Sequence, residues 1–249
     1  MMTIMKGDAT RIRIKLAARR LFAERGIDGV SIREIVSAAG QRNVGSLHYY
    51  FRTKEALVRE LITDGAKLVN DRRMLMLRAL EHDGGPRNLR AVIEILVWPS
   101  VGLGEADGEE DTYMRFIASM TMNHRSLLLD VLDDEWNSGY RQCVAHIETL
   151  LSHLPATVLK QRLTFMGIYL GAVMTMRETA FDRGGSGKDF WSAKGAMSNL
   201  IDTVQALLEG PVSVQTEKEI CAAYDLPSPL AVFFTWGERQ GAGAAAKKA

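Results

Sequence analysis

Hydrophobic and polar positions alternate with a helical period along most of the chain. Apolar residues recur three and four positions apart within 10–25, 54–81, 88–101, 111–124, 127–154, 156–183 and 189–209, and more weakly within 217–224. This spacing is typical of amphipathic α-helices. No stretch alternates strongly enough to predict a sheet, and the Gly-rich segments at 102–110 and 184–187 predict loops. We therefore predict an all-α fold.

The segment from residue 31 to residue 57 predicts two short helices, a tight turn and the start of a longer helix. Ser31 and Glu34 have the spacing of a capping box, and Gly40 ends the first helix. The inward positions are Ile32, Ile35, Val36 and Ala39 in the first helix and Val44, Leu47 and Phe51 in the second. A two-turn helix with a polar outer face, held by its neighbours, is typical of helix-turn-helix DNA recognition.

The same residues, SIREIVSAAGQRNVGSLHYYFRTKEAL, resemble the pattern TIREIAxxAGVSxGTLYxYFxSKEAL of TetR-type (tetracycline-repressor-like) transcriptional regulators over about 10–61. Two positions depart from that pattern. Gln41-Arg42-Asn43-Val44 stands where three residues are expected, and His48 stands where tyrosine is usual. Both departures fall where the family contacts its operator, so the resemblance leaves the operator sequence open.

This resemblance implies a domain organisation and an assembly. We expect a three-helix DNA-binding domain at 1–57 with a flexible arm at 1–9, and a larger helical effector-binding and dimerisation domain at 58–210. A C-terminal extension at 211–249 follows, in which Phe233, Phe234 and Trp236 dock on the body and the last residues are disordered. The resemblance also implies a homodimer that pairs through the helices at about 156–183 and 189–209.

Charge is distributed unevenly, although the formal net charge at pH 7 is only +1. Residues 1–60 contain 12 Lys/Arg and 6 Asp/Glu, while the remainder contains 19 and 24. A positive field concentrated on one small domain is the expected footprint of phosphate binding.

The candidate DNA contacts gather on the helix-turn-helix. Arg42 and Asn43 are the best candidates for base edges, because arginine pairs with guanine and asparagine with adenine. The alternative is an ordinary polar turn. The resemblance assigns Lys54 a phosphate contact, and at least one of two adjacent tyrosines should reach DNA. The full set is Ser31, Arg33, Arg42, Asn43, Gly45, Ser46, His48, Tyr49, Tyr50 and Lys54.

A second set of candidates would line a pocket for a small effector in the body. Its members are apolar or aromatic, which suits ligand walls, and the methionines make such walls adaptable. Taken singly, each is more typical of plain core. The set is Trp98, Tyr113, Phe116, Met120, Trp136, Tyr140, Phe165, Met166, Tyr169 and Met174, with Asn123, His124, Arg177 and Glu178 as polar anchors.

Other classes of function find little support. Cys143 and Cys221 form neither a zinc pattern nor a disulfide framework, the histidines lack ligand spacing, and no catalytic motif is present. We predict no catalytic residue, no metal and no cofactor. Without a signal peptide or a membrane span, we expect a cytoplasmic protein. The favoured reading is an effector-released repressor that binds double-stranded operator DNA as a dimer. The alternatives are an activator of the same fold, or a helical small-molecule-binding protein without specific operator recognition.

Overall fold

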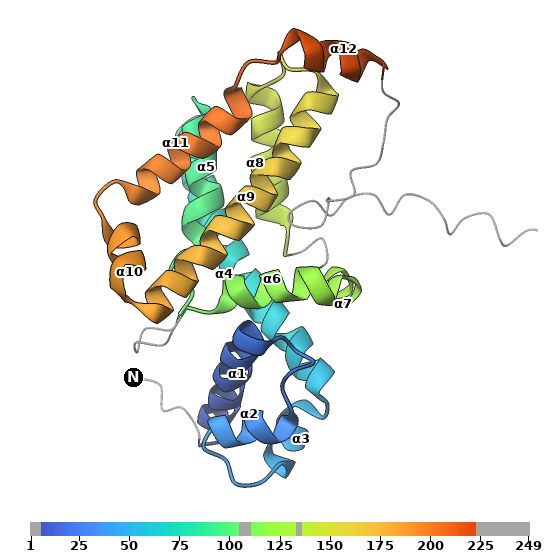
Figure 1. Cartoon of the computed structure of the whole chain (residues 1–249), viewed down its shortest axis with the longest axis vertical. Coiled ribbons are helices and arrows are strands. Elements are labelled where there is room, and N and C mark those ends of the chain that lie inside the picture. Colours follow the sequence, from blue (N-terminus) through green and yellow to red (C-terminus); the bar gives the residue numbers. More distant parts are fainter. Residues whose placement is uncertain (1–5, 105–110, 133–135, 223–249) are drawn as a thin grey trace, which may run out of the picture.

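The computed structural model describes residues 6–104, 111–132 and 136–222, and every regular element within them is a helix (Figure 1). A small head and a larger body are joined by one long helix. The all-α prediction is confirmed. None of the described helices is long and apolar enough to cross a membrane.

The head consists of α1 (Lys6–Arg25), α2 (Ile32–Ala38), α3 (Gly45–Phe51) and the beginning of α4 (Lys54–His82). Its fully or almost fully buried side chains include Ile14, Ala18, Phe22, Ile35, Leu47, Phe51 and Leu57. The expected arm at 1–9 is corrected in part, because residues 6–9 are helical. Asp8 lies in the first turn of α1, where a carboxylate favours the positive end of the helix dipole. Residues 1–5 lie outside the described range.

The body contains α5 (Leu89–Val97), a 3-10 turn at Trp98–Ser100, α6 (Tyr113–Asn123), α7 (Arg125–Val131), α8 (Ser138–Leu150), α9 (Ala156–Arg183), α10 (Gly185–Ser192), α11 (Ala196–Glu209) and α12 (Val214–Ala222). In Figure 1, α5, α8, α9 and α11 form the upper bundle, while α6 and α7 lie across its lower end, above the head. The bounds of α9 are those predicted from the sequence.

Three predicted elements of the body are wrong. The single helix at 127–154 is two helices, since Leu132 is extended and a new helix starts at Ser138. This restart brings the backbone N–H of Gly139 to 3.0 Å from Asn70 Oδ1 on α4. The loop expected at 184–187 belongs largely to α10, and the helix expected at 189–209 is interrupted before α11 by Gly195, whose φ is +90°.

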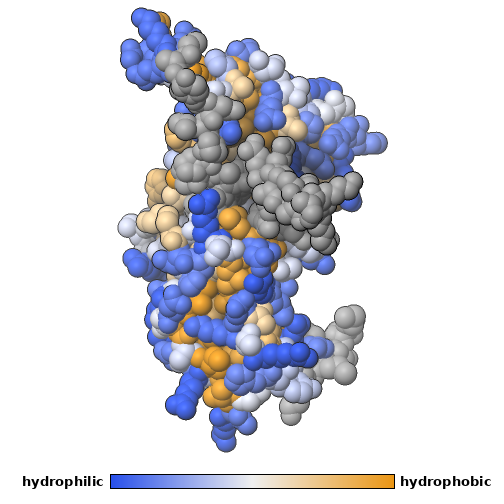
Figure 2. Space-filling view, turned by 90° about the vertical axis from the view of Figure 1, so that its right-hand side faces the viewer, coloured by the Kyte–Doolittle hydropathy of each residue, from blue (hydrophilic) through white to orange (hydrophobic). Residues whose placement is uncertain are grey.

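Helix α6 joins the body to the head. The rings of Phe116 on α6 and Phe22 on α1 stack with their centroids 6.2 Å apart. Arg59 on α4 and Asp130 on α7 add an ion pair of 2.7 Å. On the side shown in Figure 2, apolar surface continues from the level of α6 and α7 into the head. The buried apolar residues of the head and body therefore form one continuous core.

The helix bounds do not test the predicted boundary at residue 57, and the Phe233, Phe234 and Trp236 docking prediction lies outside the described residues.

Candidate nucleic-acid interface

A complete capping box fixes the start of α2, as the sequence predicts. Glu34 Oε2 accepts the backbone N–H of Ser31 at 2.8 Å, and Ser31 Oγ accepts the backbone N–H of Glu34 at 3.3 Å. Arg25 adds an ion pair to Glu34 at 2.8 Å. The hydrogen bonds to the Ser31 backbone and hydroxyl, followed by Arg25, lower the pKa of Glu34 to about 2. The Ser31 side chain is thus engaged in holding α2.

The turn between α2 and α3 accommodates the additional residue without displacing the inward face of α3. Gly40 adopts a φ of +67°, which glycine tolerates, and the backbone N–H of Gln41 donates to the carbonyl of Val36 at 2.9 Å. Asn43 Oδ1 then accepts the N–H of Gly45 at 2.8 Å. Because Asn43 stabilises the first turn of α3, its amide oxygen is already occupied.

The outer face of α3 presents an aromatic ring and an imidazole. Tyr49 is 81% exposed, whereas Tyr50 is half-buried and meets Tyr49 edge to face at 4.9 Å. Tyr49 is therefore the tyrosine that projects outward. His48 Nδ1 lies 2.8 Å from the carbonyl oxygen of Arg52, so an Nδ1–H donor leaves Nε2 as the acceptor of a neutral ring. Ser46 is half-buried and Gly45 is exposed on the same helix.

Positive charge without an acidic partner concentrates around this helix-turn-helix. Within the part of the chain that the structure describes, Arg33, Arg42 and Arg52 are exposed and form no ion pair. By contrast, Arg11, whose guanidinium lies 5.5 Å from the centre of the Phe51 ring, pairs with Glu60 at 2.7 Å. Arg52 was missed by the sequence prediction, although it directly follows α3. Its φ of +61° is uncommon for a residue with a side chain.

Lys54 occupies a different place from the one expected. Its ammonium donates to the backbone carbonyls of Ile27 and Val30 at 2.5 and 2.6 Å, and it lies 5.7 Å from the centre of the Phe22 ring. The side chain is half-buried. In the free protein Lys54 therefore holds the loop between α1 and α2. Its ammonium does not point outward for the expected phosphate contact.

Part of the predicted effector set does come together in the body. Tyr140, Met166 and Met174 border one hollow of about 20 Å³ between helices. The other lining residues are Leu96, Val97, Ser100, Met114 and Leu170. This volume is far below the lower end of the range for small-molecule sites, about 300 Å³. The methionine-lined pocket is therefore closed.

The other members of that set lie elsewhere, which corrects the prediction of a shared lining. Phe116 packs on Phe22, and Met120 is fully buried in the continuous core. Tyr113 packs on Gly65 of α4. Trp98 and Phe165 are 41% and 55% exposed, and Trp136 and Tyr169 are half-buried. The reason is topological, because α6 faces the head as well as the bundle.

Glu178 anchors the first turn of α6 to α9. Its two carboxylate oxygens accept the backbone N–H groups of Met114 and Arg115, each at 2.8 Å. Burial, followed by the neighbouring Asp111 carboxyl, raises the pKa of Glu178 to about 8. Arg115 in turn pairs with Asp182 at 2.8 Å. Glu178, which the sequence suggested as a ligand anchor, thus holds α6, the helix that contacts the head. It lies one turn along α9 from Met174.

Comparison with known proteins identifies the head. The model of a family described as "Bacterial regulatory proteins, tetR family" matches residues 14–61. The match begins in α1, contains α2 and α3, and ends in α4. No curated protein matches the chain.

Proposed function

Because this chain belongs to the tetR family of bacterial regulatory proteins and is a DNA-binding transcriptional regulator, we propose that it is a repressor released by a small effector. In this proposal a dimer binds a near-palindromic operator. Its effector is apolar or aromatic and enters the closed methionine-lined pocket.

The observation that carries the DNA-binding role is the outer surface of the helix-turn-helix. It combines the projecting Tyr49, the outer ring nitrogen of His48 and three exposed arginines that have no acidic partner among the described residues. We assign Arg42 to a guanine edge, because a guanidinium can bond both O6 and N7. Arg33 and Arg52 would contact phosphates. Asn43 would act mainly by holding the turn, since its amide oxygen accepts the N–H of Gly45, the first residue of α3.

The proposed dimer rests on an uncovered stripe of α9. Phe165, Ile168, Ala172 and Met176 are exposed at intervals of three and four residues, so they share one face of the helix. Apart from Ala206, the exposed positions of α11 are polar, and we therefore place the centre of the interface on α9. Twofold symmetry would present two recognition helices to half-sites roughly 34–36 Å apart.

The proposed switch runs through α6. An effector that opens the pocket must displace its lining, which includes Met114 in the first turn of α6. The same helix carries Phe116, which stacks on Phe22 in the head. A shift of α6 would therefore change the orientation of the head. Release requires that the effector bind the DNA-competent and displaced states with unequal affinity.

Footprinting on the DNA that flanks the gene of this protein tests the proposal. The purified protein would be titrated across a salt series with non-specific competitor DNA present. We expect protection of a near-palindrome that survives competitor. Arg42→Ala should weaken discrimination among operator variants, with a cost of about 1–3 kcal/mol at the contacted base pair.

Two results would redirect the proposal. Binding that disappears with competitor would favour a helical small-molecule-binding protein, which the additional residue in the turn at 40–44 also motivates. A reporter gene that loses expression when the regulator is deleted would show activation instead of repression.

A further inference from the structure

A cleft separates the head from the body beside α1. About 260 Å³ of open space lies between α1 and α4, at the level where Tyr113 of α6 packs against Gly65. Its apolar lining comes from Ile12, Leu16, Leu61, Leu68, Leu103 and Tyr113. This space is more than ten times that of the methionine-lined pocket and approaches the lower end of the range for small-molecule sites, about 300 Å³.

Among the residues that the structure describes around the cleft, Arg19 is a cation without an acidic partner. Lys15 at the edge of the cleft pairs with Asp64 at 2.5 Å and with Glu60 at 3.1 Å. Arg11 also pairs with Glu60, so the charges of these four side chains offset. Arg19 also borders the cleft and uses Nε to donate to Thr112 Oγ1 at 3.1 Å. Arg19 makes no ion pair with any residue in the described ranges. Since no described residue bonds its two terminal amino groups, these can bind an anion.

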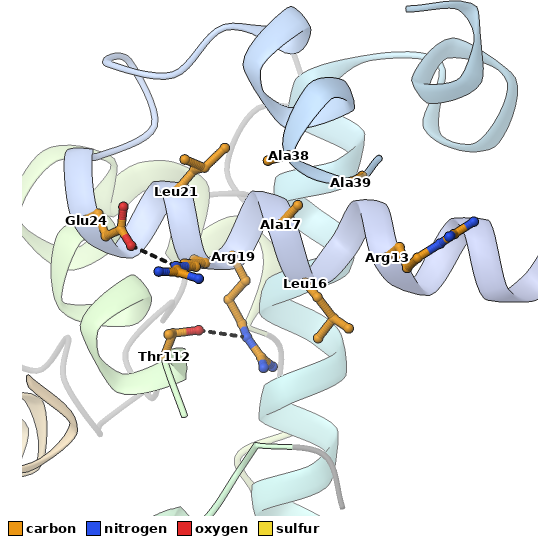
Figure 3. Close-up of a pocket in the computed structure, with 10 residues that line it drawn as sticks. Arg13, Leu16, Ala17, Arg19, Leu21, Glu24, Ala38, Ala39 and Thr112 are labelled. Carbon is orange, nitrogen blue, oxygen red and sulfur yellow. Dashed lines mark hydrogen bonds and ion pairs between the residues drawn. The ribbon is translucent and has the colours of Figure 1, made fainter. Parts of the chain in front are cut away.

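Arg19 differs from its neighbour Arg20 in the spaces that it borders. Arg19 and Leu16 also border an open groove of about 590 Å³ on the other flank of α1. In Figure 3, Arg19 leaves α1 toward Thr112, and its guanidinium extends beyond their hydrogen bond. Arg20, on the groove side only, pairs instead with Glu24 at 2.9 Å. Arg19 thus borders both the cleft and the groove, whereas Arg20 borders the groove alone.

We infer that the cleft between α1 and α4 is a second ligand site, which takes a small amphipathic anion with its apolar part against Leu16 and Leu68 and its acidic group on Arg19. The apolar lining supplies burial, and the guanidinium supplies charge-assisted hydrogen bonds to a carboxylate or sulfonate. The site is separate from the methionine-lined pocket, with which it shares no lining residue.

Fluorescence titration with anilinonaphthalene sulfonate tests this inference on the full chain without DNA. This probe is an aromatic molecule with one sulfonate, so it has the chemistry that the cleft should select. Leu68→Trp would fill the mouth of the cleft from a position that is 38% exposed, and should weaken binding about tenfold. Leu75→Trp, seven residues along the same helix and 70% exposed, is the matched control and should bind like the wild type.

Two variants that each remove one arginine charge provide an independent measurement. Arg19→Gln should weaken the probe about tenfold, whereas Arg20→Gln should not, because Arg20 lies outside the cleft. Thermal melts should show all four variants folded. Equal affinities for the two tryptophan variants, or for the two glutamine variants, would place the probe elsewhere and overturn the inference. Since no DNA is present, this result is independent of whether an operator exists.

Discussion

At the residue scale, two cations near the end of the helix-turn-helix are held in opposite ways. Arg52 is exposed and unpaired within the described residues, while the Lys54 ammonium is fixed to the carbonyls of Ile27 and Val30. Only the first is free to meet a phosphate. The family resemblance predicted a phosphate contact for Lys54 and none for Arg52. The sequence does not reveal that Lys54 contacts a loop more than twenty residues earlier in the chain, because this contact depends on the tertiary fold.

Replacing each cation by alanine separates the two roles. Lys54→Ala should lower the free energy of unfolding by about 1–3 kcal/mol, because two buried carbonyls lose a charged donor. Arg52→Ala should leave stability nearly unchanged and reduce the salt slope of DNA binding by about 1. Urea unfolding and binding titrations at several salt concentrations measure these effects. Full stability in Lys54→Ala would contradict the fastening role.

The carboxyl of Glu178 should make stability depend on pH. Its pKa is raised from 4.5 to about 8 in the folded chain, mainly by burial, so the folded state binds the proton more tightly than the unfolded state. The stabilisation is fully present below pH 4.5 and is lost as pH rises through about 8. The loss should be on the order of a few kcal/mol, since one pKa unit corresponds to about 1.4 kcal/mol.

Urea unfolding between about pH 5 and about pH 9 measures this dependence. Glu178→Gln should flatten the alkaline fall. Asp111→Asn should shift the fall toward lower pH, because it removes the neighbouring acid that helps raise the pKa. An unchanged pH profile in both variants would assign the dependence to other groups.

At the scale of elements, α4 and α6 cross with almost no space between them. A Cβ added to Gly65 would lie 2.0–2.4 Å from three ring carbons of Tyr113. Tyr113 is buried, and its hydroxyl donates to the carbonyl of Ile62 at 3.2 Å. The ring cannot swing aside without losing that bond, so glycine is required at this crossing.

Gly65→Ala should therefore destabilise the protein by about 1–3 kcal/mol through overpacking, despite a helix-propensity gain of up to about 1 kcal/mol. In a Tyr113→Leu background the same change should become neutral or stabilising, because the clash is gone. Thermal unfolding of the two single variants and the double variant tests this reversal. Equal costs of Gly65→Ala in both backgrounds would contradict the close crossing.

The elements also show which structural signals are local. The capping box of α2 and the bounds of α9 follow from nearby residues, and both were predicted. The helix α10 was not predicted, because its glycine-rich start suggests a loop. Gly184 and Gly185 have φ of +70° and +66° at its beginning, and α10 then packs along α9. Tertiary packing overrides weak local propensity there.

The predicted sites differ in the same way, because one depends on local spacing and the other on tertiary packing. The exposed face of α3 followed from the spacing of Leu47 and Phe51 within one helix. Membership of the methionine-lined pocket depends on how four helices and the 3-10 turn meet, which periodicity does not specify. Phe116 and Phe165 illustrate this limit, since one packs toward the head and the other faces outward.

At the scale of the whole molecule, the exposed stripe of α9 should control assembly. Ile168→Glu would bury a charge without a partner in the proposed interface, and should weaken dimerisation about a hundredfold or more. Leu75→Glu changes an apolar residue that is 70% exposed on α4 and should leave assembly unchanged. Sedimentation velocity over a concentration series measures both. A dimer that tolerates Ile168→Glu would place the interface elsewhere.

The continuity of α4 also restricts how the head can be aimed. Lys54–His82 forms 29 helical residues without a break. The number of residues in α4 therefore fixes the rotation of the head relative to the body about the axis of this helix. Each inserted residue would turn the head about 100° around the helix axis and move it about 1.5 Å. Seven inserted residues would nearly restore the direction while lengthening the rod by about 10.5 Å. In this architecture, a single-residue insertion in α4 alters operator geometry as severely as the loss of a recognition side chain.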